Sequence, residues 1–279
     1  MLVTTARPTV FGIARRAWTS LFAAAGSMAL LFIIGYGLMV GLDIAIDRMS
    51  HLLAMPTDAV LKDLVKNNRR LPWLGVSEAF GRDIAVCFLR ALIAAPLAVA
   101  MYRFILLGEV RRFYVLSRLS FKFAVWVVLL QVPVMVLSWL ILFAGNATAL
   151  VPLLTVLGVA MLLLLMQTAQ LFPAVAVEER TADTSARLET ALERSEGMFW
   201  LTLISLVLTF LPLILVRAVI MRAGAKLAQH VPLAVPIGLA TTGFVIVMLG
   251  SAVIAWLFSY GAHKKNTPQP AGQQPLSAT

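Results

Sequence analysis

QLFPAVAVEERTADTSARLETALERSEGMFW, residues 170–200, is the stretch that decides the fold class. Apolar runs of roughly twenty residues precede and follow it, and each is long enough to cross a bilayer as a helix. The charged part between them is therefore expected to connect two membrane crossings on the membrane surface. Apolar positions recur in it at helical spacing, which predicts an amphipathic helix in the headgroup layer. Its apolar stripe consists of Leu188, Ala191, Leu192, Ser195 and Phe199.

The composition extends this interpretation to the whole chain. Hydrophobic residues make up 61% of the sequence and charged residues 13%, whereas soluble domains have about 25% charged residues. The net charge of +10 comes from Lys and Arg that gather at the ends of apolar runs, where they orient a membrane protein. We therefore expect a lipid bilayer, and within it a membrane protein, as partners, and no nucleic acid. A single cysteine, Cys87, excludes an intrachain disulfide.

The predicted fold is an all-α polytopic transmembrane bundle of six helices with amphipathic interfacial helices. The first apolar run is too long for a signal peptide, so we expect it to remain as a span. An interfacial helix carrying Arg15 and Arg16 is expected to lead into that span, and a short helix over 58–68 to rest on the opposite surface, with Trp73 as an anchor. The transmembrane domain covers residues 1–262, with spans at about 21–42, 84–107, 124–143, 149–172, 199–219 and 233–260, and a flexible tail follows at 263–279.

Arg90 is the most informative polar residue, because an arginine inside a bilayer costs about 2.5 to 3.5 kcal/mol unless it is paired or reaches water. Asp43 lies at the adjoining end of the preceding span. The sequence therefore predicts an Asp43–Arg90 ion pair that joins the first two spans, with a structural role favoured over substrate binding. Gln131, Gln167 and Gln170 form a candidate polar lining, although such amides also serve as helix contacts.

Small residues suggest two helix contacts. Gly37 and Gly41 have the GxxxG spacing that lets a second helix approach closely, although glycine is also common in membrane helices for no such reason. Thr202, Ser205 and Thr209 lie on one side of the fifth span and predict another contact.

Motifs of enzymes are missing from the sequence. It contains no Gly-x-Ser-x-Gly, no Walker loop and no HExxH, and the histidines His51, His230 and His263 share no ligand spacing. We expect no catalytic, cofactor or metal site, and no cofactor.

Two segments carry a family resemblance: PLAVAMYRFILLGE at 96–109, and LFPAVAVEE at 171–179 followed by ALERSEGMFW at 191–200. Together they resemble a group of uncharacterised bacterial polytopic proteins related to the membrane domain fused to some glycerophosphoryl diester phosphodiesterases. The catalytic domain of those enzymes has no counterpart here. The resemblance implies a six-span protein of the bacterial inner membrane without assigned chemistry. Lys and Arg are more numerous on the side of the two termini, which predicts that both termini are cytoplasmic.

Three functions remain open from the sequence. The first is a non-catalytic membrane protein that acts in envelope organisation or as a membrane partner. The alternative is a small-solute transporter or channel with a polar lining around Arg90 and the intramembrane glutamines. The third is a lipid-handling protein, for which a groove open sideways to the bilayer between the fourth and fifth spans is the distinguishing feature.

Overall fold

The computed structural model describes residues 9–52, 73–144, 151–177, 198–230 and 233–266. These residues are almost entirely helical and form no strand. Six candidate membrane spans lie in α2 (Ala29–Leu52), α4 (Trp73–Leu107), α5 (Arg118–Ala144), α6 (Val151–Thr168) with its continuation, α9 (Phe199–His230) and α10 (Ala234–Asn266). Two further helices are α1 (Val10–Ser27) and the short α7 (Leu171–Val177). The all-α polytopic bundle predicted from the sequence is confirmed.

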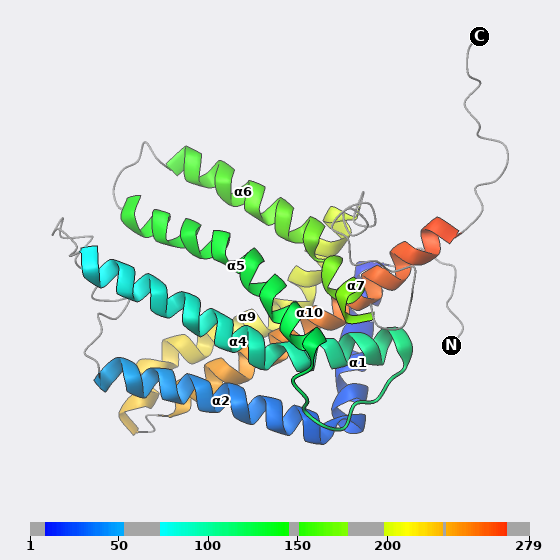
Figure 1. The fold of residues 1–279 in the computed structure, drawn as a ribbon, viewed down its shortest axis with the longest axis horizontal. Coiled ribbons are helices and arrows are strands. Elements are labelled where there is room, and N and C mark those ends of the chain that lie inside the picture. The colour runs from blue at the N-terminus through cyan, green and yellow to red at the C-terminus, as the bar shows by residue number, and fades with distance from the viewer. Residues whose placement is uncertain (1–8, 53–72, 145–150, 178–197, 231–232, 267–279) are drawn as a thin grey trace, which may run out of the picture.

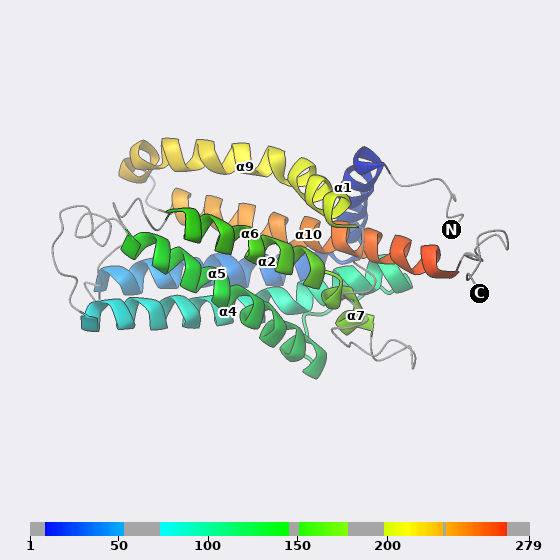
Figure 2. The same ribbon diagram turned by 90° about the horizontal axis from the view of Figure 1, so that it is seen from above.

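Helices α4 and α10 pack against each other at the centre of the bundle, and the other helices are arranged around them (Figures 1 and 2). In each of these two spans 44% of the residues are buried, against 11% in the spans of α6 and α9. Helix α2 packs against α4 and α10, α5 against α4, and α9 against α10. The centre is therefore formed by two helices, and the two least buried spans lie at the periphery.

Helix α1 lies across one end of the bundle instead of along it (Figure 1). The Thr9 side chain accepts a hydrogen bond from the Gly12 backbone N–H at 3.2 Å and so caps its start. Its apolar side, which includes Ile13, Ala17 and Leu21, is buried against α9 and α10. A helix is therefore present where the interfacial helix is predicted, and it is longer than expected.

The predicted start of the first span at residue 21 is wrong. The chain turns at Met28, between α1 and α2, and the first candidate span runs over Ala29–Ile46. Leu21 and Ala24 of α1 are buried in the bundle. The residues between them are also apolar, so the high hydropathy continues without interruption through the bend. The other spans lie close to the predicted positions, but α9 continues past residue 219 to His230 and α10 continues into the predicted tail, to Asn266.

The fourth span also differs, because α6 ends at Thr168 and α7 begins at Leu171 after a turn. Most of the predicted surface helix at 188–199, the helix predicted over 58–68 and the tail beyond residue 266 fall outside the described residues.

The close helix contact predicted at Gly37 and Gly41 is wrong, because it occurs at a different glycine of the same helix. Nothing lies within 4 Å of a Cβ placed on Gly37 or Gly41, so neither glycine is needed for a close approach. The close contact is made by Gly35 on the same helix, where an added Cβ would lie 2.6 Å from the Cδ2 atom of Leu97. Gly35 therefore allows α2 to approach α4 closely.

Candidate functional site

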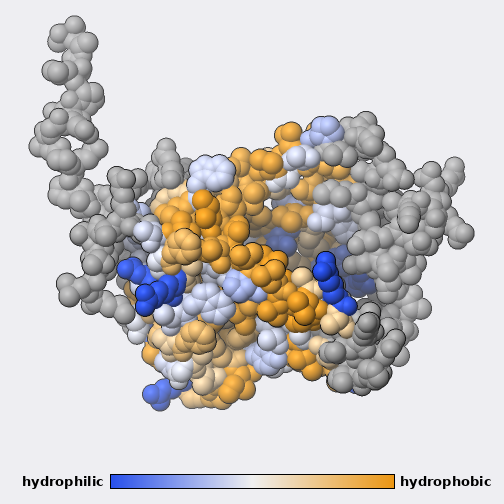
Figure 3. Space-filling model, turned by 180° about the vertical axis from the view of Figure 1, so that it is seen from behind, coloured by the Kyte–Doolittle hydropathy of each residue, from blue (hydrophilic) through white to orange (hydrophobic). Residues whose placement is uncertain are grey.

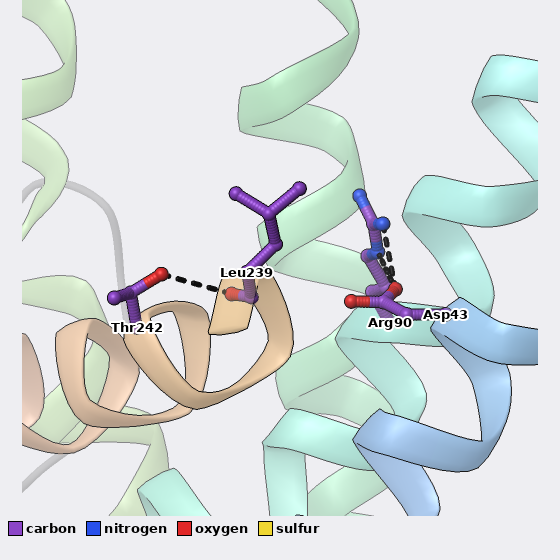
Figure 4. A network of polar contacts seen from close by, with 4 residues as sticks. All are labelled: Asp43, Arg90, Leu239 and Thr242. Atoms are coloured by element: carbon purple, nitrogen blue, oxygen red, sulfur yellow. Dashed lines mark hydrogen bonds and ion pairs between the residues drawn. The ribbon is translucent and has the colours of Figure 1, made fainter. Parts of the chain in front are cut away.

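The predicted contact between Asp43 and Arg90 is present and joins α2 to α4 (Figure 4). Arg90 donates to the Oδ1 atom of Asp43 from Nε at 3.1 Å and from Nη2 at 2.7 Å. The Asp43 side chain is 15% exposed and that of Arg90 is 53% exposed. Thr242 of α10, drawn beside the pair, donates instead to the Leu239 carbonyl of its own helix.

The pair lies below the charged layer at the end of the bundle opposite α1. Asp43 precedes Asp47 by four residues and Arg90 follows Asp83 by seven, which at the rise of an α-helix gives depths of about 6 Å and about 10 Å. A guanidinium has five N–H donors, and within the described part of the chain Arg90 uses Nε and Nη2 to contact Asp43. Arg90 is thus held in place by Asp43 while part of its guanidinium remains accessible.

The three glutamines of the predicted lining lie in different environments. Gln131 on α5 and Gln167 on α6 are exposed, whereas Gln170, between α6 and α7, is 1% exposed. Both amide atoms of Gln170 lack a hydrogen-bond partner among the described residues. Buried amides normally have hydrogen-bond partners. Of the three glutamines, Gln170 is therefore the one that requires an additional polar group as its partner.

The small polar stripe on α9 is buried, as a helix contact requires. Thr202, Ser205 and Thr209 are each at most 2% exposed, and Thr209 donates to the Ser205 carbonyl at 2.6 Å. A second polar contact, at an exposed position, joins α2 to α10, where the Tyr36 and Thr241 hydroxyls lie 2.9 Å apart.

Arg103 forms a buried contact that sequence reasoning missed. It is 4% exposed, donates from Nε to the Ala176 carbonyl of α7 at 2.9 Å and contacts Glu109 through Nη1 at 3.3 Å. Gly108, with φ +69°, reverses the chain after α4 and so returns Glu109 toward Arg103. The sequence treats Arg103 as one more orienting charge at the end of a span.

The bundle is open on one side between α6 and α9. Helix α6 packs mainly against α5 and α9 mainly against α10, and the two diverge toward the end opposite α1 (Figures 1 and 2). Seen from behind, the molecule is hollowed on this side, with hydrophobic walls and hydrophilic atoms at depth (Figure 3). The exposed apolar side chains of the two helices include Val156, Val159 and Leu163 on α6, and Val207 and Leu211 on α9.

No group of three or more metal-ligating side chains occurs among the residues that the structure describes. Comparison with models of protein families, with curated proteins and with solved structures finds no match for this chain.

Proposed function

We propose that this protein is a non-catalytic membrane protein that binds another component of the membrane in the lateral opening between α6 and α9, and that this component is a lipid. The observation that carries the proposal is the divergence of two poorly buried spans that are consecutive in the sequence. A hollow with apolar walls that opens toward the bilayer suits acyl chains, because they can enter without crossing a polar barrier. Arg90, half exposed at membrane depth, supplies a cation near the opposite end from α1.

The proposal places the protein in a bacterial inner membrane, with α1 and the end of α10 on the cytoplasmic side. It assigns no reaction to the chain. The alternative occupant of the same opening is a helix of a membrane protein partner. Binding of either occupant within the membrane would serve envelope organisation. The experiment below separates the two occupants.

The experiment is native mass spectrometry of the protein purified in mild detergent, compared between variants with enlarged side chains on α9 and a control variant on α5. Val207→Trp and Leu211→Trp enlarge exposed side chains on α9, and Leu129→Trp is a matched control on the exposed side of α5. We expect a lipid that survives delipidation in the wild type and in the control but is reduced in an α9 variant. Equal lipid retention in all variants, or none in the wild type, contradicts the proposal, and a retained protein identifies the other occupant.

A small-solute transporter or channel is the second candidate, and Gln170 is the observation that favours it. A buried amide without a partner indicates a site for water or a polar guest. In a Cys87→Ala background, Gln170→Cys should react with small hydrophilic thiol reagents from both sides of the membrane if a path passes this residue. Protection from both sides eliminates this candidate and leaves the lipid proposal standing.

A further inference from the structure

The segment between α4 and α5, residues 108–117, is named here the return segment. It forms no helix and is fixed at three points. Gly108 donates its N–H to the Phe104 carbonyl at 3.2 Å, the Tyr114 hydroxyl donates to the Ile93 carbonyl at 2.9 Å, and Ser117 caps α5 by accepting the Ser120 N–H at 3.2 Å. The return segment is therefore a defined surface feature of the fold.

The Tyr114 contact shows where the return segment runs. Ile93 precedes the end of α4 by 14 residues, which corresponds to about 21 Å along the helix. It lies three residues before Pro96, in the turn where the proline removes a backbone donor. The Tyr114 hydroxyl therefore donates to a carbonyl of a proline-disturbed turn, and the chain folds back along the side of α4 before α5 begins.

The outer side of the return segment is apolar. Val110, Phe113, Val115 and Leu116 are all exposed, with Phe113 at 68%, and Phe121 in the first turn of α5 adds to them. An irregular backbone cannot lie in the hydrocarbon layer in contact with lipid, because its polar groups would be unsatisfied. At an interface the backbone can keep water while such side chains insert.

The same segment is strongly basic. Arg111, Arg112, Arg118 and Lys122 lie within twelve consecutive positions, and the sequence from Val110 to Val177 contains no Asp or Glu. In the described part of the chain, no carboxylate pairs with Arg111, Arg112 or Arg118. The acidic residue of the return segment, Glu109, contacts Arg103.

We propose that the return segment binds the headgroups of anionic phospholipids, with Phe113 inserted into the interface and Arg111 and Arg112 on the phosphates. The charge complementarity favours this occupant over a neutral lipid surface, since each arginine near an anionic membrane strengthens binding by roughly five-fold. Helix α1, with Arg15 and Arg16, lies at the same end of the bundle (Figure 1). This site is separate from the lateral opening between α6 and α9 and does not depend on it.

The test uses one fluorescent label on the full chain. In a Cys87→Ala background, Phe113→Cys carries an environment-sensitive fluorophore, and phosphatidylglycerol is titrated against phosphatidylcholine in mixed micelles. We expect a blue shift that saturates with phosphatidylglycerol, weakens with salt and does not occur with phosphatidylcholine alone. Arg111→Gln with Arg112→Gln should raise the half-saturating fraction of phosphatidylglycerol by about five-fold for each charge or abolish the response.

The matched control removes two exposed arginines from the other end of the bundle, Arg217→Gln with Arg222→Gln, and should leave the titration unchanged. Arg112→Gln alone is the milder variant, because this side chain is exposed and is not needed for packing. An equal response to both lipids, an unaffected double variant, or the same loss in the control overturns the proposal. So does a label that shifts in native membranes but in neither lipid, since that result identifies a protein on this surface.

Discussion

Breaking the Asp43–Arg90 pair should destabilise the bundle by a measurable amount. Asp43→Asn leaves the guanidinium of Arg90 without its counter-ion, at a depth of about 10 Å below the level of Asp83. An unpaired arginine at the centre of a membrane helix costs about 2.5 to 3.5 kcal/mol. Because Arg90 lies toward one end of the span, where a long side chain reaches toward the interface, we expect about half of that, roughly 1 to 2 kcal/mol.

The appropriate measurement is a double-mutant cycle on unfolding in bicelles, with Asp43→Asn, Arg90→Gln and the double variant. If the two charges stabilise each other, the double variant is less destabilised than the sum of the single variants, by about 1 kcal/mol or more. That corresponds to several-fold in the ratio of folded to unfolded protein. Additive single effects, or no loss in Asp43→Asn, would refute the reasoning that this pair joins α2 to α4.

Three further predictions concern packing and the return segment. Arg103→Met should lower stability by about 3 kcal/mol, because it removes a partly buried ion pair and the hydrogen bond to α7; an unchanged thermal unfolding midpoint would contradict this. Gly35→Ala should destabilise by about 1 to 3 kcal/mol through collision with Leu97, whereas Gly37→Ala should be neutral, as measured by thermal unfolding. Burial raises the pKa of Tyr114 above its ordinary 10.0, so its contribution to stability should persist below pH 10 and be lost as pH rises through the higher value; Tyr114→Phe should remove one tyrosine from the part of the 295 nm titration that lies above pH 10.

The membrane class and the number of spans were predictable because they depend on length and apolar content alone. The Asp43–Arg90 contact was predictable because two opposite charges lie at similar depths on consecutive spans, and consecutive antiparallel helices are usually neighbours.

The remaining features depend on tertiary contacts that leave no pattern in residue types. The partner of Arg103 on α7 is a backbone carbonyl 73 residues away, and any residue at that position would present the same carbonyl. The bend at Met28 lies inside an apolar run, and the role of Gly35 depends on which side of α2 faces Leu97. Hydropathy does not show where an apolar run bends, and glycine spacing does not show which side of a helix faces its neighbour.

The central claim is that six helices cross a bilayer and return the chain to the side on which it began. Single cysteines in a Cys87→Ala background, labelled with a membrane-impermeant maleimide in intact and opened spheroplasts, test it directly. Thr9→Cys, Val110→Cys and Asn266→Cys, at the end of α10, should react only after opening, and Arg222→Cys, near the opposite end, should react in both. Reaction of Thr9→Cys and Asn266→Cys from opposite faces of the membrane would contradict the account.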